Sequence, residues 1–111
     1  MVRIGAIVWQ VSDVGRASEF WRGALGYEAT PDNPDFLADP RGSGPRLHLD
    51  TTDRMHLDLW AEDAAEQRAE VERLVSLGAR VVEDWVYPED ADFVVLADPD
   101  GNLFCVIDRS A

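Results

Sequence analysis

The sequence predicts an α+β fold made of two copies of one unit, each running strand, helix, strand, strand, strand. The segment Leu-Ala-Asp-Pro-x-Gly occurs twice, from Leu37 and from Leu96, each time before a short apolar stretch. Helix caps, Leu-Gly pairs and closing strands recur around it in the same order, at offsets that grow from 50 to 52 to 59 residues. A common tight turn would explain one of these coincidences, whereas an internal duplication with loop insertions explains all of them.

The first half, about residues 3–50, opens on IGAIVWQV, whose β-branched and aromatic residues predict a strand over 4–11. Asp13 suits a helix N-cap, and apolar side chains then recur at helical spacing up to Leu25. Gly26 fits the left-handed position that ends a helix. Shorter strands are expected over 27–30, 36–38 and 46–50, with DPRGSG as the hairpin between the last two.

The second half, about residues 54–109, repeats this plan. A strand is expected over 55–61, followed by a helix that Asp63 and Glu66 begin as a capping box and that Gly78 ends. Further strands are expected over 79–87, 93–97 and 103–108, with DPDGN as a hairpin. The helix places Ala64, Val71, Leu74 and Val75 on its apolar face, and its charged residues are predicted to be solvated: Glu62, Glu66, Arg68, Glu70, Glu72 and Arg73.

Length and composition limit the function. A chain of 111 residues is expected to form one domain over 1–111. Its formal net charge of −12 argues against binding to nucleic acid, whose affinity depends on cationic contacts to phosphate. A single cysteine, Cys105, permits no intrachain disulfide, and no segment resembles a leader or a membrane span. A cytoplasmic location without membrane attachment is therefore expected.

Alternation along the strands indicates which side chains share a face of the sheet. Leu57 and Leu59 form an apolar row, so His56, Asp58 and Trp60 face the other way. The same argument sets both histidines and the only cysteine on one face. That pocket face is predicted to hold Ala6, Val8, Gln10, Arg46, His48, Asp50, Leu103, Cys105 and Ile107, and the core face Ile7, Trp9, Val11, Leu47, Leu49, Phe104 and Val106.

The ordered motifs VSD, SEFW, LGY, HLDL, LGARVV and DPDGNLFCV resemble those of the vicinal oxygen chelate superfamily. The chain is most similar to its glyoxalase-like and bleomycin-resistance-like members, over about residues 4–108. The resemblance implies two βαβββ modules that form a curved, half-open, eight-stranded mixed sheet around a pocket, with the helices on the outer face. It also implies a homodimer, and the edge strand over 3–11 is an obvious place for partner contact.

The same resemblance maps the metal-ligand positions of the superfamily onto Ala6, His48, His56 and Cys105. His56 matches the usual histidine, but Ala6 has no ligand atom, Cys105 replaces a glutamate, and His48 stands where a carboxylate or amide is usual. No cofactor is therefore expected. The alternative is a divalent metal held by His48, His56 and Cys105, since two imidazoles and a thiolate suit zinc.

Six further residues are candidates for ligand contact. Asp58 is either a general base that also orients an imidazole or an ordinary solvated carboxylate. Trp60 is a candidate platform for a planar ligand, with Trp85 and Tyr87 closing over it. Gln10 and Arg46 are candidate polar anchors.

Three functions remain open. The leading prediction is metal-independent binding of a small organic molecule, aromatic or cationic, by Gln10, His48, His56, Asp58, Trp60, Trp85 and Cys105. The second is a metal-dependent lyase, isomerase or dioxygenase in which His48, His56 and Cys105 hold the ion and Asp58 moves a proton. The third is an interaction module without catalysis. The sequence leaves open whether the chain is an enzyme.

Overall fold

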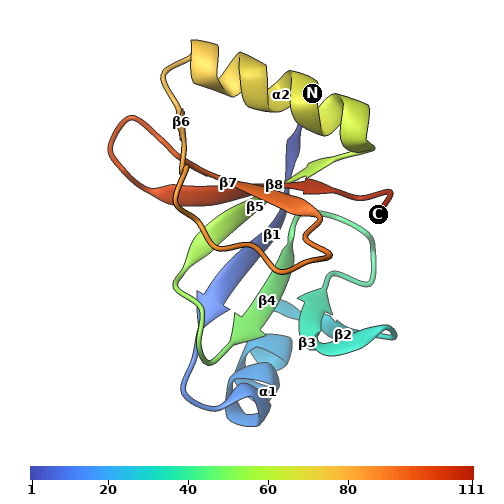
Figure 1. Ribbon diagram of the computed structural model, residues 1–111. Coiled ribbons are helices and arrows are strands. Elements are labelled where there is room, and N and C mark those ends of the chain that lie inside the picture. Colours follow the sequence, from blue (N-terminus) through green and yellow to red (C-terminus); the bar gives the residue numbers. More distant parts are fainter. The chain divides into compact units, whose positions relative to one another are not determined.

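The computed structural model describes residues 1–111 and confirms the α+β class (Figure 1). Eight strands form an open mixed sheet, accompanied by two helices. The chain divides into two compact units, which we name the N-terminal unit (5–55) and the C-terminal unit (1–4 with 56–111). The elements are β1 (Arg3–Gln10), α1 (Val14–Leu25), β2 (Glu28–Thr30), β3 (Asn33–Ala38), β4 (Arg46–Asp50), β5 (His56–Ala61), α2 (Ala64–Ser76), β6 (Arg80–Val81), β7 (Phe93–Ala97) and β8 (Leu103–Asp108).

The two halves share one topology, as the internal repeat predicts. In the first, β1 pairs parallel with β4, and β3 pairs antiparallel with both β4 and β2. In the second, β5 pairs parallel with β8, and β7 pairs antiparallel with both β8 and β6. In each half the helix follows the first strand and connects it to the other three. Neither helix is long and apolar enough to cross a membrane.

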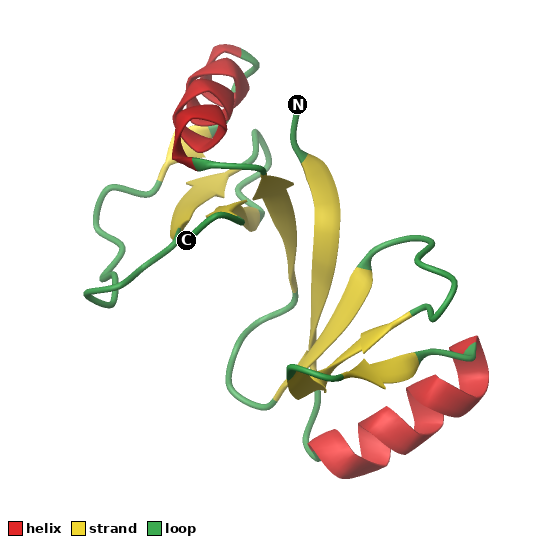
Figure 2. Ribbon diagram, turned by 90° about the vertical axis from the view of Figure 1, so that its right-hand side faces the viewer, coloured by secondary structure: helices red, strands yellow, loops and turns green.

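Capping interactions are found at the helix ends that the sequence predicts. The Asp13 carboxylate accepts the Arg16 backbone N–H at 2.9 Å, and Gly26 adopts φ = 70° at the other end of α1. The Asp63 carboxylate likewise accepts the Glu66 N–H at 2.8 Å. Figure 2 shows α1 lying along one face of the strands of its own half. There Trp21 packs edge-on against Trp9, with ring centroids 5.9 Å apart.

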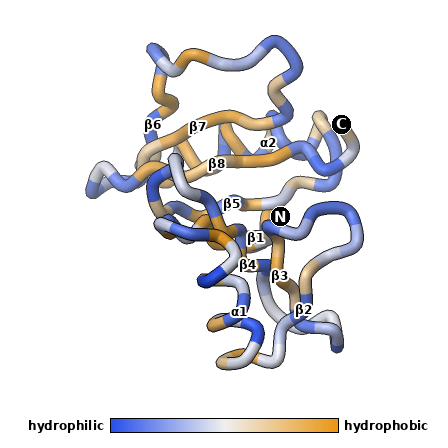
Figure 3. The backbone as a smooth tube through the Cα atoms, turned by 90° about the horizontal axis from the view of Figure 1, so that it is seen from below, coloured by the Kyte–Doolittle hydropathy of each residue, from blue (hydrophilic) through white to orange (hydrophobic).

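The core of the C-terminal unit lies between α2 and the sheet. Leu96 and Val106 are fully buried, and Val71, Leu74 and Phe104 pack around them. Figure 3 shows β7 and β8 as predominantly apolar strands. Phe104 and Val106 therefore lie on the α2 side of β8, as alternation predicts, and Cys105 points to the opposite face.

Glu70 corrects the prediction that every charged residue of α2 is solvated. It is only 6 % exposed. Its carboxylate accepts the Val2 N–H at 2.6 Å and the Arg73 Nε–H at 2.6 Å. The Arg73 guanidinium lowers the pKa of Glu70 to about 2. A buried carboxylate is tolerated here because both of its oxygens have donors.

The strand predicted over 79–87 is wrong in length, because only Arg80–Val81 form β6. The Val82 N–H still bonds the Val95 carbonyl at 3.1 Å, and the chain then turns, with the Trp85 N–H 3.4 Å from the Val82 carbonyl. Beyond the turn, the Tyr87 hydroxyl accepts the Val95 N–H at 2.8 Å. A side chain therefore takes the place that a longer β6 backbone would occupy.

The first half contains two smaller differences. β3 begins at Asn33, three residues before the predicted start. In β1 the most buried side chains are Ala6 and Val8, at 1 % and 2 % exposed, whereas Ile7 and Trp9 are half-buried. The predicted core face of β1 does carry Trp9 against α1, but the tightest packing in this strand lies on its other face.

Candidate functional site

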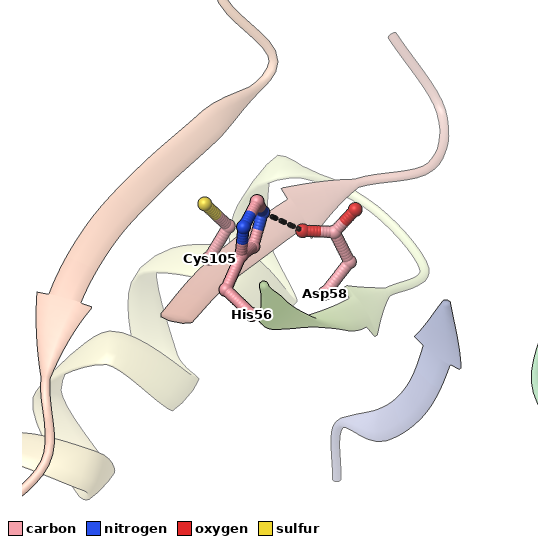
Figure 4. Close-up of side chains that lie close together, drawn as sticks. All are labelled: His56, Asp58 and Cys105. Atoms are coloured by element: carbon pink, nitrogen blue, oxygen red, sulfur yellow. Dashed lines mark ion pairs between the residues drawn. The ribbon is translucent and has the colours of Figure 1, made fainter. Parts of the chain in front are cut away.

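Three side chains with metal-ligating or acid–base chemistry meet on β5 and β8. His56 and Asp58 alternate on β5 and therefore share a face. Cys105 lies directly opposite Asp58 in the parallel pairing of β5 with β8. The possible ligand atoms of His56, Asp58 and Cys105 all lie within 4.8 Å of one another. Figure 4 shows the three side chains gathered on these two strands.

The closest contact in this group joins the imidazole and the carboxylate. His56 Nε2 lies 3.2 Å from Asp58 Oδ1, and the two side chains are 10 % and 16 % exposed (Figure 4). A carboxylate at this distance fixes the orientation of the ring. The pair is therefore equipped to hold a proton or to present polar atoms to a ligand.

The same group has a donor set that fits a metal ion. An imidazole, a carboxylate and a thiolate are all ligands that zinc accepts, and three protein ligands leave one position for a further molecule. This set differs from the predicted His48, His56 and Cys105, because Asp58 stands with the other two. Ala6 offers no ligand atom.

His48 lies in the N-terminal unit, on β4. Its ring stacks on Phe36 with centroids 4.1 Å apart, and its Nε2 is 3.9 Å from Asp50 Oδ2. Arg46 on the same strand lies over the same Phe36 ring, with its guanidinium carbon 6.0 Å from the ring centroid. A role for His48 beside His56 stays a prediction.

Trp60 continues the alternation that begins with His56 and Asp58. Two arginines meet its ring: the guanidinium carbon of Arg109 is 3.7 Å from the ring centroid, and that of Arg3 is 5.4 Å away. The three side chains line a cavity of about 200 Å³ together with Met1, Ala61, Glu62 and Glu66.

Neither arginine was predicted from the sequence as a site residue. Arg109 nevertheless continues the alternation of Cys105 and Ile107 into the turn that follows β8, which is a signal that the sequence contains. The register that sets Ile107 beside Trp60 is a long-range feature, and the sequence alone does not supply it. Arg3 precedes the apolar part of β1 and has no local signal of this kind.

The remaining predicted contacts are spread over the chain. Gln10 is exposed at the end of β1. Trp85 is 39 % exposed in the loop after β6. The Tyr87 hydroxyl accepts the Val95 N–H, and the Tyr87 ring packs against Phe93 with centroids 5.3 Å apart. Closure of Trp85 over Trp60 stays a prediction.

Comparison with known proteins finds a matching family and several structures with the same fold. A family model described as a glyoxalase-like domain matches residues 6–107. No curated protein matches the sequence. A structure described as an NAD-dependent benzaldehyde dehydrogenase from Legionella pneumophila superposes with a TM-score of 0.67 at 15% identity, covering 92% of this chain and 96% of that one.

Two further structures share the fold. Streptomyces coelicolor methylmalonyl-CoA epimerase, in complex with 2-nitronate-propionyl-CoA, has a TM-score of 0.60 at 17% identity over 100% of this chain and 99% of that one. A glyoxalase/bleomycin resistance protein/dioxygenase superfamily member from Vibrio splendidus has a TM-score of 0.57 at 16% identity over 96% and 97%. At these identities the likeness concerns the fold, and the activities belong to those proteins. The match of the family model over nearly the whole chain shows that this protein belongs to the glyoxalase-like domain family.

Proposed function

We propose that this glyoxalase-like domain binds a small organic molecule on the face of β5 and β8, without needing a metal ion. The observation that carries the proposal is the His56–Asp58 pair, whose closest atoms are 3.2 Å apart on a largely enclosed surface. The two side chains contact each other directly, without an added cation between them. The pair retains polar atoms for a ligand carbonyl or hydroxyl group, because an imidazole has a second nitrogen and a carboxylate a second oxygen.

Trp60 supplies the apolar part of the proposed site. Its ring lies on the same face of β5 as the pair, about 7 Å along the strand from Asp58. An aromatic face beside a few convergent polar groups is the usual composition of a small-molecule site. The structurally similar methylmalonyl-CoA epimerase also binds a small-molecule ligand, which supports the proposal at the level of the fold.

The test is a calorimetric titration with benzamide, a neutral aromatic probe, in buffer with and without EDTA. We expect the same affinity in both buffers. His56→Ala and Asp58→Asn are each expected to weaken binding by about tenfold, the effect of one lost charge-assisted hydrogen bond. Asp53→Asn, an exposed position before β5, is the matched control and should change nothing. Loss of binding in EDTA, or equal affinity in all four proteins, would contradict the proposal.

A second candidate function is a metal-dependent enzyme, and the three donor atoms within 4.8 Å favour it. His56, Asp58 and Cys105 would hold the ion, which would act as a Lewis acid toward a bound carbonyl group. Zinc titration of chelator-treated protein distinguishes the two functions. One tight site per chain, lost in Cys105→Ser and in His56→Ala but kept in His48→Ala, would establish this candidate.

We also propose that the chain works as a homodimer, as its resemblance to the superfamily implies. Sedimentation equilibrium at micromolar concentration should give twice the mass of one chain. A single-chain mass at every concentration would show that the homodimer does not form.

A further inference from the structure

The arginine pair on Trp60 gives the proposed site a charge that the composition does not suggest. The chain has a net charge of −12, yet Arg3 and Arg109 both meet one indole ring, at 5.4 Å and 3.7 Å from its centroid. A guanidinium held over an indole ring can still donate hydrogen bonds from the edge of its own plane. Its fork of N–H groups matches the oxygens of a carboxylate or a phosphate.

The cavity beside this pair sets the size of the group that fits. Its volume of about 200 Å³ equals that of about six or seven water molecules, whereas whole drug-sized ligands occupy about 300–1,000 Å³. It therefore suits one charged group and the carbon atoms next to it. Two carboxylates also border the cavity. Glu66 accepts the Glu62 N–H at 2.9 Å and contacts the Met1 amino group at 3.2 Å, while Glu62 is exposed.

The cavity lies further along the same strands as the His56–Asp58 pair. Trp60 follows Asp58 by two residues on β5, and Arg109 follows Cys105 by four residues, directly after β8 ends. A group held at the arginines would therefore lie at one end of a row whose other end is formed by His56 and Asp58.

From this arrangement we infer that the ligand carries an oxyanion, a carboxylate or a phosphate, which binds Arg3 and Arg109 beside Trp60. This inference rests on the proposed function and deepens it by naming the ligand class. An anionic ligand replaces the cationic ligand expected from the net charge, because charges that line a site interact more strongly with a ligand than distant charges do.

The experiment compares four probes by calorimetry at low salt: benzoate, phenyl phosphate, neutral benzamide and cationic benzyltrimethylammonium. We expect at least one of the two anions to bind about tenfold tighter than benzamide. Arg109→Gln and Arg3→Gln should each remove most of that advantage, measured in each variant as the ratio of its anion affinity to its own benzamide affinity. Arg22→Gln, which removes the same charge from α1, is the matched control and should retain the advantage.

Benzamide or the cation binding as tightly as both anions would overturn the inference, and so would an anion advantage that survives both arginine substitutions. In those outcomes the binding of benzamide still supports the proposed function. If no probe binds, the proposed function fails together with the inference. A preference for phenyl phosphate over benzoate, or the reverse, tells which oxyanion the fork fits.

Discussion

Glu70 and Glu72 lie two positions apart on α2 and differ in almost every physical respect. Glu70 is 6 % exposed and accepts hydrogen bonds from Val2 and from Arg73, whereas Glu72 is exposed. Composition and spacing do not distinguish the two residues. What distinguishes them is the start of the chain, whose backbone reaches α2 from far away in the sequence.

We predict that Glu70→Gln lowers the free energy of unfolding at pH 7 by about 1–3 kcal/mol, because an amide replaces a charged acceptor of enclosed donors. Urea denaturation measures the change. Glu72→Gln is the matched control and should cost at most about 0.5 kcal/mol. Equal stability of the two variants would contradict the role given to Glu70.

The same residue predicts a pH dependence. The pKa of Glu70 is about 2 in the folded protein, against its ordinary 4.5. Its stabilisation is therefore complete above about pH 4.5 and is lost as the pH falls toward 2, where the folded protein also takes up the proton. The difference in unfolding free energy between wild type and Glu70→Gln should shrink over this interval. A difference that stays constant from pH 5 to pH 2.5 would show that the carboxylate charge is not its source.

Among the structural elements, the two Asp-Pro-x-Gly turns explain why that segment recurs. The Asp98 carboxylate accepts the Asp100 and Asn102 N–H groups, and Gly101 donates to the Asp98 carbonyl at 2.9 Å. In the first copy the Asp39 carboxylate accepts the Arg41 N–H, and Gly42 donates to the Asp39 carbonyl at 2.8 Å. The segment is therefore a self-contained turn in each half and carries no functional group of the candidate site.

Two glycine-to-alanine substitutions, one in a turn and one in a helix, should change the free energy of unfolding in opposite directions. Gly101 has φ = 87°, and an added Cβ would meet no atom within 4 Å, so Gly101→Ala should cost about 1 kcal/mol through backbone strain alone. Gly23 lies inside α1 with equally open space, and Gly23→Ala should stabilise by about 0.5–1 kcal/mol.

Thermal unfolding of both glycine variants shows whether each substitution raises or lowers stability. Gly101→Asn is a useful third variant, because asparagine tolerates the left-handed region and should lose less stability than alanine. Stabilisation by Gly101→Ala, or destabilisation by Gly23→Ala, would contradict the assigned conformations.

Elements with local signals could be predicted from the sequence, and elements that depend on distant partners could not. The caps at Asp13 and Asp63 act within one turn of helix and were placed correctly. The strand expected over 79–87 was too long, because the Tyr87 hydroxyl accepts a hydrogen bond from the Val95 N–H. No local sequence pattern shows this contact. Alternation placed His56, Asp58 and Trp60 on one face, but the register that sets Cys105 beside Asp58 and Ile107 beside Trp60 belongs to the folded chain.

For the molecule as a whole, the acidic composition sets a salt dependence. The chain has 22 carboxylates and 10 arginines, so repulsion among like charges opposes the folded state. We predict that the melting temperature rises between low salt and about 0.2 M NaCl, as screening weakens that repulsion. Calorimetric melting with sucrose of equal osmolarity as control measures the effect. A melting temperature that falls with salt would mean that attractive ion pairs outweigh the repulsion.

A small molecule that binds the face of β5 and β8 without a metal ion should perturb the residues of that face in solution. A ¹H–¹⁵N NMR titration with benzamide and benzoate in EDTA detects such binding, with the Trp60 indole signal assigned through Trp60→Phe. We predict saturable shifts of that signal and of the backbone amides of residues 56–61 and 103–109, unchanged when EDTA is omitted. No saturable shift at these positions, or shifts that emerge only after zinc is added, would contradict metal-independent binding at this face.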